Sequence, residues 1–195
     1  MTAIREEIVL DIETQNSFED VGEGNYTALK VSTVGVYFYK TDTYKAYMEN
    51  ELADLERELS RCSLLIGFNH VKFDLPVLQP YFKNLKVERI PCMDILEYIR
   101  RIAGHRVSLN SVAAATLNTK KSGHGLDAIK YWRAGEIDKL VKYCLDDVKI
   151  TRDVYEYGLK NKEIFFTAKD PKYKTRVPVE WGNLIKNEAK QLGLF

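Results

Sequence analysis

The sequence has few cysteines, no long apolar run and almost no net charge. Its 195 residues include three cysteines, whose spacings match neither a zinc pattern nor a disulfide framework, so we expect free thiols in a reducing cytoplasm. No stretch approaches the roughly 18 apolar residues of a membrane span, and residues 1–7 contain no apolar signal region. The net charge of +1 neither favours nor excludes nucleic acid, although proteins that bind a duplex broadly are usually more basic.

The composition is that of an ordinary globular domain. Apolar residues make up 45% of the chain and charged residues 29%. A chain of this length can form one domain with a sizeable core. We therefore expect a cytoplasmic protein with no membrane association.

An acidic pair closes the first apolar segment. Apart from Asp11, residues 8–12 are apolar and mostly β-branched, which predicts a buried strand. Strand side chains alternate, so Asp11 and Glu13 share one face while Ile8, Leu10 and Ile12 occupy the other. Two adjacent carboxylates repel unless a cation lies between them, and oxygen ligands suit Mg²⁺ or Mn²⁺ rather than zinc. In isolation, the pair is also explained as an exposed acidic strand end.

A second acidic motif follows the apolar segment 64–68. Residues 69–72 predict a strand-to-helix turn, and Phe73 and Asp74 enter a helix before Pro76, a residue that a first helical turn tolerates. In isolation, Asp74 is also explained as an acid at a helix N-terminus, where the helix dipole favours it.

The third motif lies on the strongest helical pattern, from Glu136 to about Tyr157, where apolar residues recur with a period near 3.6. Tyr143 and Asp147 are four residues apart and therefore share one face. Neighbouring Asp146 is out of register and is expected to be a surface acid. In isolation, Tyr143 is also explained as an amphipathic-helix tyrosine at the edge of the core.

Together, these motifs resemble the three exonuclease motifs of the DEDD superfamily. The match is to the tyrosine-bearing branch, which includes ribonuclease D and the proofreading domains of family A and family B DNA polymerases. Residues 67–76 and 143–147 are most similar to family B proofreading domains, and the resemblance covers about residues 7–158. The histidine-bearing branch is excluded, because it would need histidine at the position of Lys142.

The resemblance implies a ribonuclease H-like α/β fold, with a mixed β-sheet flanked by α-helices on both faces. It implies two divalent cations, Mg²⁺ or Mn²⁺, held by four catalytic acids: Asp11, Glu13, Asp74 and Asp147. Tyr143 would be the fifth catalytic residue and would orient the attacking water. The residues expected beside the 3′ end of the substrate are Thr14, Asn69 and Phe73.

Further substrate contacts are expected in the segment 120–126. Two glycines flank His124, which favours a loop that approaches a substrate phosphate, and a surface-loop histidine is the alternative. The basic residues that could contact substrate, or remain ordinary solvated lysines, are Lys72, Lys120, Lys121 and Lys130.

The remaining segments alternate between strands and helices. We expect strands at 31–39, 44–48 and 85–92, and helices at 51–59, 94–102, 109–116 and 126–132. The segments 163–167 and 174–179 predict a basic β-hairpin, which either contacts a single strand or shields a sheet edge. We therefore divide the chain into an exonuclease domain at 1–160 and a C-terminal hairpin and tail at 161–195, appended to the same domain.

The last five residues resemble the peptide by which bacterial DNA polymerases and repair proteins hold the sliding clamp. The positions that would bind this partner are Gln191, Leu192, Leu194 and Phe195. A free tail can present such apolar side chains to a groove, and a tail folded onto the core is the alternative. A clamp partner would favour DNA over RNA, because the clamp encircles DNA.

The sequence therefore predicts a metal-dependent 3′→5′ exonuclease that releases nucleoside 5′-monophosphates from single-stranded ends, with DNA favoured. One alternative is an RNA-trimming 3′→5′ exoribonuclease. Another is a noncatalytic adaptor that binds nucleic acid, although a pure binder has no physical need to crowd four acids.

Overall fold

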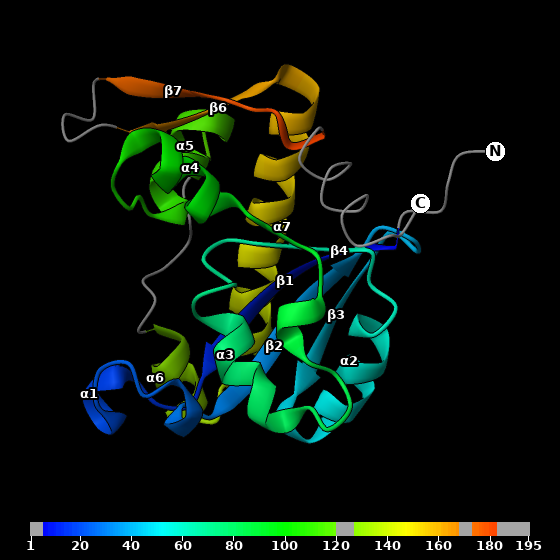
Figure 1. The fold of residues 1–195 in the computed structure, drawn as a ribbon. Helices are drawn as coiled ribbons and strands as arrows, with labels where there is room; N and C mark the ends of the chain where they lie inside the picture. Colours follow the sequence, from blue (N-terminus) through cyan, green and yellow to red (C-terminus); the bar gives the residue numbers. More distant parts are fainter. Residues whose placement is uncertain (1–5, 120–126, 168–172, 183–195) are drawn as a thin grey trace.

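The computed structural model describes residues 6–119, 127–167 and 173–182, and a five-stranded sheet lies at its centre (Figure 1). The strand order is β3-β2-β1-β4-β5. Its strands are β1 (Glu7–Thr14), β2 (Val31–Phe38), β3 (Thr43–Met48), β4 (Leu64–Gly67) and β5 (Cys92–Asp94). Strand β1 pairs antiparallel with β2 and parallel with β4, so the sheet is mixed, as expected.

Helices cover both faces of this sheet. They are α1 (Phe18–Val21), α2 (Leu52–Leu59), α3 (Asp74–Leu78), α4 (Ile95–Ala103), α5 (Leu109–Leu117), α6 (Asp127–Arg133) and α7 (Ile137–Asn161). Short 3₁₀ helices occur at Tyr26–Ala28, Glu49–Glu51, Gln79–Tyr81 and Val87–Arg89. Figure 1 shows α7 behind the sheet, with α2 and α3 in front of it. The predicted α/β fold with helices on both faces is confirmed.

The alternation of side chains along β1 builds two apolar cores. Ile8 and Leu10 pack with the buried leucines of α2 and α3 on one face. Val9 packs on the other face with apolar residues of α4, α5 and α7. Asp11 and Glu13 continue the Val9 side of the strand, so they point toward α7. The predicted alternation in this strand is confirmed.

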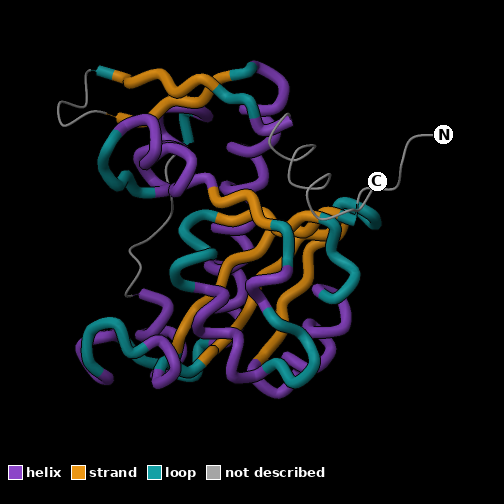
Figure 2. Tube along the Cα trace, viewed as in Figure 1, coloured by secondary structure: helices purple, strands orange, loops and turns teal. Residues whose placement is uncertain are grey.

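A second, two-stranded sheet lies at one end of the molecule beside α4 and α5 (Figure 2). It is the predicted hairpin, formed by β6 (Glu163–Thr167) and β7 (Lys174–Pro178). The Thr116 hydroxyl bonds to the backbone of Phe165, with a 2.8 Å bond to its carbonyl oxygen and a 2.9 Å bond from its N–H. Lys174 Nζ donates to the Ala115 carbonyl oxygen at 2.7 Å, so this basic side chain anchors the hairpin on α5.

The predicted strand at 85–92 is wrong. Only its last residue pairs in the sheet, where β5 begins, and Val87–Arg89 forms a 3₁₀ helix instead. Side chains accept hydrogen bonds from two backbone N–H groups that a strand would have paired with a neighbouring strand. Glu56 accepts from the Leu85 N–H at 2.7 Å, and Gln79 accepts from the Val87 N–H at 3.0 Å. Periodicity could not reveal these two partners, because both lie outside the segment.

The predicted helices at 51–59, 94–102, 109–116 and 126–132 are confirmed to within two residues. Asp94 and Ser108 are the N-caps of α4 and α5, and each side chain accepts a backbone N–H at 3.1 Å. Among the described residues, no helix has both the length and the apolar character needed to cross a membrane.

Candidate active site

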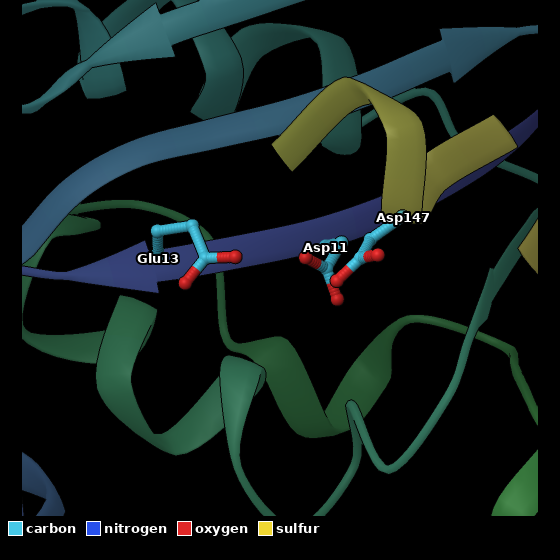
Figure 3. Close-up of side chains that lie close together, drawn as sticks. All are labelled: Asp11, Glu13 and Asp147. Atoms are coloured by element: carbon cyan, nitrogen blue, oxygen red, sulfur yellow. The ribbon is translucent and has the colours of Figure 1, made fainter. Parts of the chain in front are cut away.

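Three carboxylates converge where β1 passes α7 (Figure 3). One ligand oxygen from each of Asp11, Glu13 and Asp147 lies within 4.8 Å of the others. Asp11 and Glu13 come from the same face of β1, and Asp147 comes from the middle of α7. Residues more than a hundred positions apart in sequence thus form one acidic cluster.

Close packing fixes α7 against the sheet at this point. The Cys144 thiol accepts from the Gly35 N–H at 3.1 Å and donates to the Asp11 carbonyl oxygen at 3.5 Å. A Cβ atom on Gly35 would lie 2.9 Å from the Cys144 sulfur, so only glycine lets α7 approach so closely. This contact sets the separation of Asp11 and Asp147.

Asp74 lies in the same cavity but is not part of the three-carboxylate cluster. It is the first residue of α3 and is 5% exposed. Burial raises the pKa of this carboxyl to about 8 in the metal-free protein. A cation in the cavity would lower this pKa again, because positive charge favours the ionised acid.

The cavity has a volume of about 430 Å³. Its polar lining includes the four acids, together with Thr14, Asn16, Ser17 and Asn69. Its apolar lining includes Phe18, Leu29, Phe68, Phe73, Leu109 and Ile129. The three substrate-contact residues that the sequence predicts from described segments, Thr14, Asn69 and Phe73, therefore border the same space as the acids.

Tyr143 occupies a different position. It is 5% exposed and packs with Ala128 and Leu140, where α6 meets α7. Its ring lies edge-on to Tyr131, with centroids 6.3 Å apart. Tyr143 is one turn before Asp147 on α7, but it is not among the residues that line the cavity.

The basic residues expected near substrate make ion pairs with other acids. Lys72 pairs with Glu97 at 3.0 Å, and Lys130 pairs with Asp127 at 2.9 Å. No lysine or arginine of the described ranges lines the cavity. Lys120, Lys121, His124 and the tail residues Gln191, Leu192, Leu194 and Phe195 lie outside the described residues.

The donor set of the acidic cluster fits a hard divalent cation. All three potential ligands are carboxylate oxygens, which suit Mg²⁺ or Mn²⁺. Asp147 is only 4% exposed, so little water reaches it to screen the neighbouring charges. Asp11, Glu13 and Asp147 could hold such an ion, with Asp74 in the same cavity.

The fold and this site define a class of protein. The sequence matches the RNase H superfamily over residues 8–158, and the chain belongs to that superfamily. The membership supports a nuclease, and RNase H-like nucleases typically use divalent metals, in agreement with the acidic cluster. A search of curated proteins found no match.

Sequence reasoning missed part of the cavity wall. Phe18, Leu29, Leu109 and Ile129 come from segments without a motif. Each is an ordinary apolar residue within a helix or loop pattern, so no local signal distinguishes it from a core residue. Only the packing of α1, α5 and α6 around the end of β1 brings them together.

Proposed function

We propose that this chain is a metal-dependent 3′→5′ exonuclease of the tyrosine-bearing DEDD branch. It would act on single-stranded ends and release nucleoside 5′-monophosphates. The observation that carries this proposal is a single cavity lined by four carboxylates together with aromatic and aliphatic side chains. Such a cavity can receive a phosphodiester beside its acids and a base against its apolar lining.

The cavity size favours a chain end as the substrate. Its volume of about 430 Å³ is that of a small-molecule site rather than a long groove. Because no described lysine or arginine lines it, the protein itself offers little positive charge to a phosphate there. The phosphate charge would therefore have to be met by cations held between the acids.

The mechanism divides the work among residues of the chain. Asp11, Glu13, Asp74 and Asp147 would hold two divalent cations, which in such sites neutralise the phosphate and activate water. Tyr143 would orient the attacking water, as the resemblance implies, which requires its hydroxyl to reach the cavity from the contact between α6 and α7. Phe73 would contact the terminal base, and Thr14 and Asn69 would help to hold the 3′ end in line for attack.

Two observations bear on the alternatives. The carboxylates of Asp11, Glu13 and Asp147 crowd within 4.8 Å of one another, with Asp74 buried in the same cavity, and an adaptor has no physical reason to retain this arrangement. Nothing in the described cavity distinguishes a 2′-hydroxyl from a 2′-hydrogen, so the preference for DNA over RNA rests on the clamp-like tail. An RNA-trimming exonuclease is the second candidate.

The test is a side-by-side digestion of a 5′-labelled single strand of DNA and the same sequence in RNA, with Mg²⁺ and with Mn²⁺. We expect a descending ladder, loss of activity in EDTA, and resistance of a strand whose 3′ end carries a phosphate. Rapid cutting of a circular single strand would contradict the exonuclease proposal. Faster digestion of the RNA strand than of the DNA strand would contradict the DNA preference and favour the RNA-trimming exonuclease.

We also propose that residues 191–195 bind a bacterial sliding clamp. Short peptides bury little area, so the affinity is expected on the order of micromolar. Calorimetry with a 15-residue C-terminal peptide and a clamp tests this directly. Deleting residues 191–195 should abolish clamp binding and leave the rate on free oligonucleotides unchanged. A truncated protein that unfolds, or a peptide that does not bind, would contradict the clamp proposal. It would also take away the main support for DNA as the preferred substrate.

The division into residues 1–160 and an appended 161–195 also remains a proposal. It is supported by the buried residues of the hairpin, Ile164 and Val177, which join the same apolar core as Val9. On this reading, the hairpin braces α5 rather than forming an independent unit.

A further inference from the structure

One buried carboxylate outside the acidic cluster gathers three backbone N–H groups. Asp94 ends β5 and is 8% exposed. Its Oδ1 accepts from the Asn69 N–H at 2.9 Å and from the Glu97 N–H at 3.1 Å, and its Oδ2 accepts from the Val71 N–H at 3.1 Å. Asp94 is thus more than the N-cap of α4, because two of its three donors belong to the turn before α3.

The turn that Asp94 holds is an unusual piece of backbone. Asn69 has φ of 70°, in the left-handed region, which asparagine adopts more readily than most other non-glycine residues. The His70 ring is fully buried beneath the turn, and its Nδ1 lies 3.6 Å from Asp94 Oδ2. A Cβ atom on Gly67 would lie 2.6 Å from the His70 ring, so the glycine leaves room for it. Such a conformation persists only where its surroundings hold it.

The same turn starts the helix that carries Asp74. The Asn69 carbonyl oxygen accepts from the Phe73 N–H at 3.0 Å, and the His70 carbonyl oxygen accepts from the Leu75 N–H at 2.9 Å. The conformation of this turn therefore determines where Phe73 and Asp74, two residues of the cavity lining, are placed. A second link, the 3.0 Å ion pair of Lys72 with Glu97, joins the turn to the first turn of α4.

We propose that Asp94 is a positioning residue for the exonuclease reaction. It acts through the 69–71 turn to set Asp74 and Phe73 against the Asp11 cluster, and it touches neither substrate nor cation. The inference rests on the proposed function for its effect on turnover. Its effect on the turn itself does not depend on that function.

The chain provides a matched control. Glu56 is also 8% exposed, and its carboxylate likewise accepts backbone N–H groups of a loop, from Asn84 and Leu85. That loop lies outside the cavity lining. Asp94→Ala and Glu56→Ala therefore remove the same kind of interaction at two places, only one of which supports the site.

The experiment compares both variants with the wild type by amide hydrogen exchange, Mn²⁺ calorimetry and turnover on a 5′-labelled oligonucleotide. In Asp94→Ala, the Asn69 and Val71 amides should exchange faster, Mn²⁺ affinity should fall several-fold, and turnover should drop about 10- to 100-fold, as small misplacements of reacting groups do. In Glu56→Ala, only the Asn84 and Leu85 amides should exchange faster, with turnover within about two-fold of wild type.

A milder variant keeps the test decisive if Asp94→Ala does not fold. Asp94→Asn retains one oxygen for Asn69 and Glu97 but loses the acceptor for Val71, so it should show an intermediate loss of turnover. Equal losses in Asp94→Ala and Glu56→Ala, or wild-type turnover in Asp94→Asn with a faster-exchanging Val71 amide, would overturn the proposal. A wild-type protein without nuclease activity would overturn the proposed function instead. Mn²⁺ affinity would then decide the positioning role, and an unchanged value in the Asp94 variants would refute it.

Discussion

The acidic cluster and part of the apolar lining of the cavity lie on different parts of the fold. The carboxylates of Asp11 and Asp147 are on β1 and α7, the central strand and the longest helix, which bury apolar side chains along their length. Part of the apolar lining, Phe18, Leu109 and Ile129, comes from the short helices α1, α5 and α6. An exposed ion pair, Asp20 with Arg133 at 3.0 Å, joins α1 to α6. Such pairs contribute little to stability. We therefore expect the acids to be held more rigidly than this part of the apolar lining.

The largest expected effect is in the acidic cluster. Asp147→Asn removes a negative oxygen ligand from the acidic cluster, so turnover on single-stranded DNA should fall by several orders of magnitude. Asp11→Ala should do the same. The measurement is initial rate with EDTA-washed protein and added Mg²⁺, with circular dichroism to verify folding.

The neighbouring acid is the control for this change. Asp146 is on the same helix and pairs with Lys142 at 2.6 Å, away from the cavity lining. Asp146→Asn should therefore keep wild-type turnover. Retained activity in Asp147→Asn or in Asp11→Ala would refute the assignment of the cluster to metal binding.

A smaller loss is expected from the hydroxyl of Tyr143. Tyr143→Phe leaves every acid in place, so Mn²⁺ binding by calorimetry should be unchanged, while the rate falls about 10- to 1,000-fold for the loss of one orienting group. Tyr131→Phe, in the ring that packs against Tyr143, is the control and should stay active. Wild-type turnover in Tyr143→Phe would mean that this tyrosine only packs between α6 and α7.

In the apolar lining, truncation should affect binding more than chemistry. Leu109→Ala removes part of the apolar lining, so KM for an oligonucleotide should rise about three- to ten-fold, with kcat within about two-fold. Leu117→Ala, at the other end of α5 and also half-buried, should leave KM unchanged. If Leu109→Ala lowers kcat as much as it raises KM, the apolar wall is part of the rigid frame and the comparison fails.

A further effect is expected on stability as a function of pH, rather than on activity. Burial raises the pKa of Asp74 to about 8 and lowers the pKa of His70 to about 4. Folded Asp74 holds a proton that the unfolded chain releases, so its contribution to stability is present at low pH and is lost as pH rises to about 8. The His70 contribution is present above about pH 6.5 and is lost as pH falls toward 4, so the two oppose each other below pH 6.5.

Between pH 6.5 and 8 only the Asp74 effect remains, and the metal-free protein should lose stability by at most about 1.4 kcal/mol per pH unit. Thermal melts in EDTA at the two pH values measure this loss. Asp74→Asn should melt at the same temperature at both pH values. Mn²⁺ should restore the wild-type protein at pH 8. A wild-type melting temperature that does not fall between pH 6.5 and 8 would show that Asp74 is already ionised without metal.

Local patterns predicted most of the fold correctly. The strands at β1 and β4 and the long helix α7 have strong periodicity, and the caps Asp94 and Ser108 have side chains that bond their own helix starts. The strand prediction at 85–92 failed because long-range contacts, rather than local patterns, determine the structure there. Its backbone is satisfied by Glu56 and Gln79, which approach from other elements, so no pattern within the segment could reveal them.

The sequence alone determined the chemistry of the site, because the types and order of the acids on β1, α3 and α7 are local facts that a motif records. Tertiary structure decided which of these groups meet. It joins Asp11, Glu13 and Asp147, sets Asp74 beside them in a buried position, and leaves Tyr143 at the contact between two helices. It also decided which apolar residues line the cavity and that Asp94 bonds to the turn before α3. Contacts between residues far apart in sequence depend on how helices pack on a sheet. The sequence around an ordinary leucine or phenylalanine does not indicate where that packing will place it.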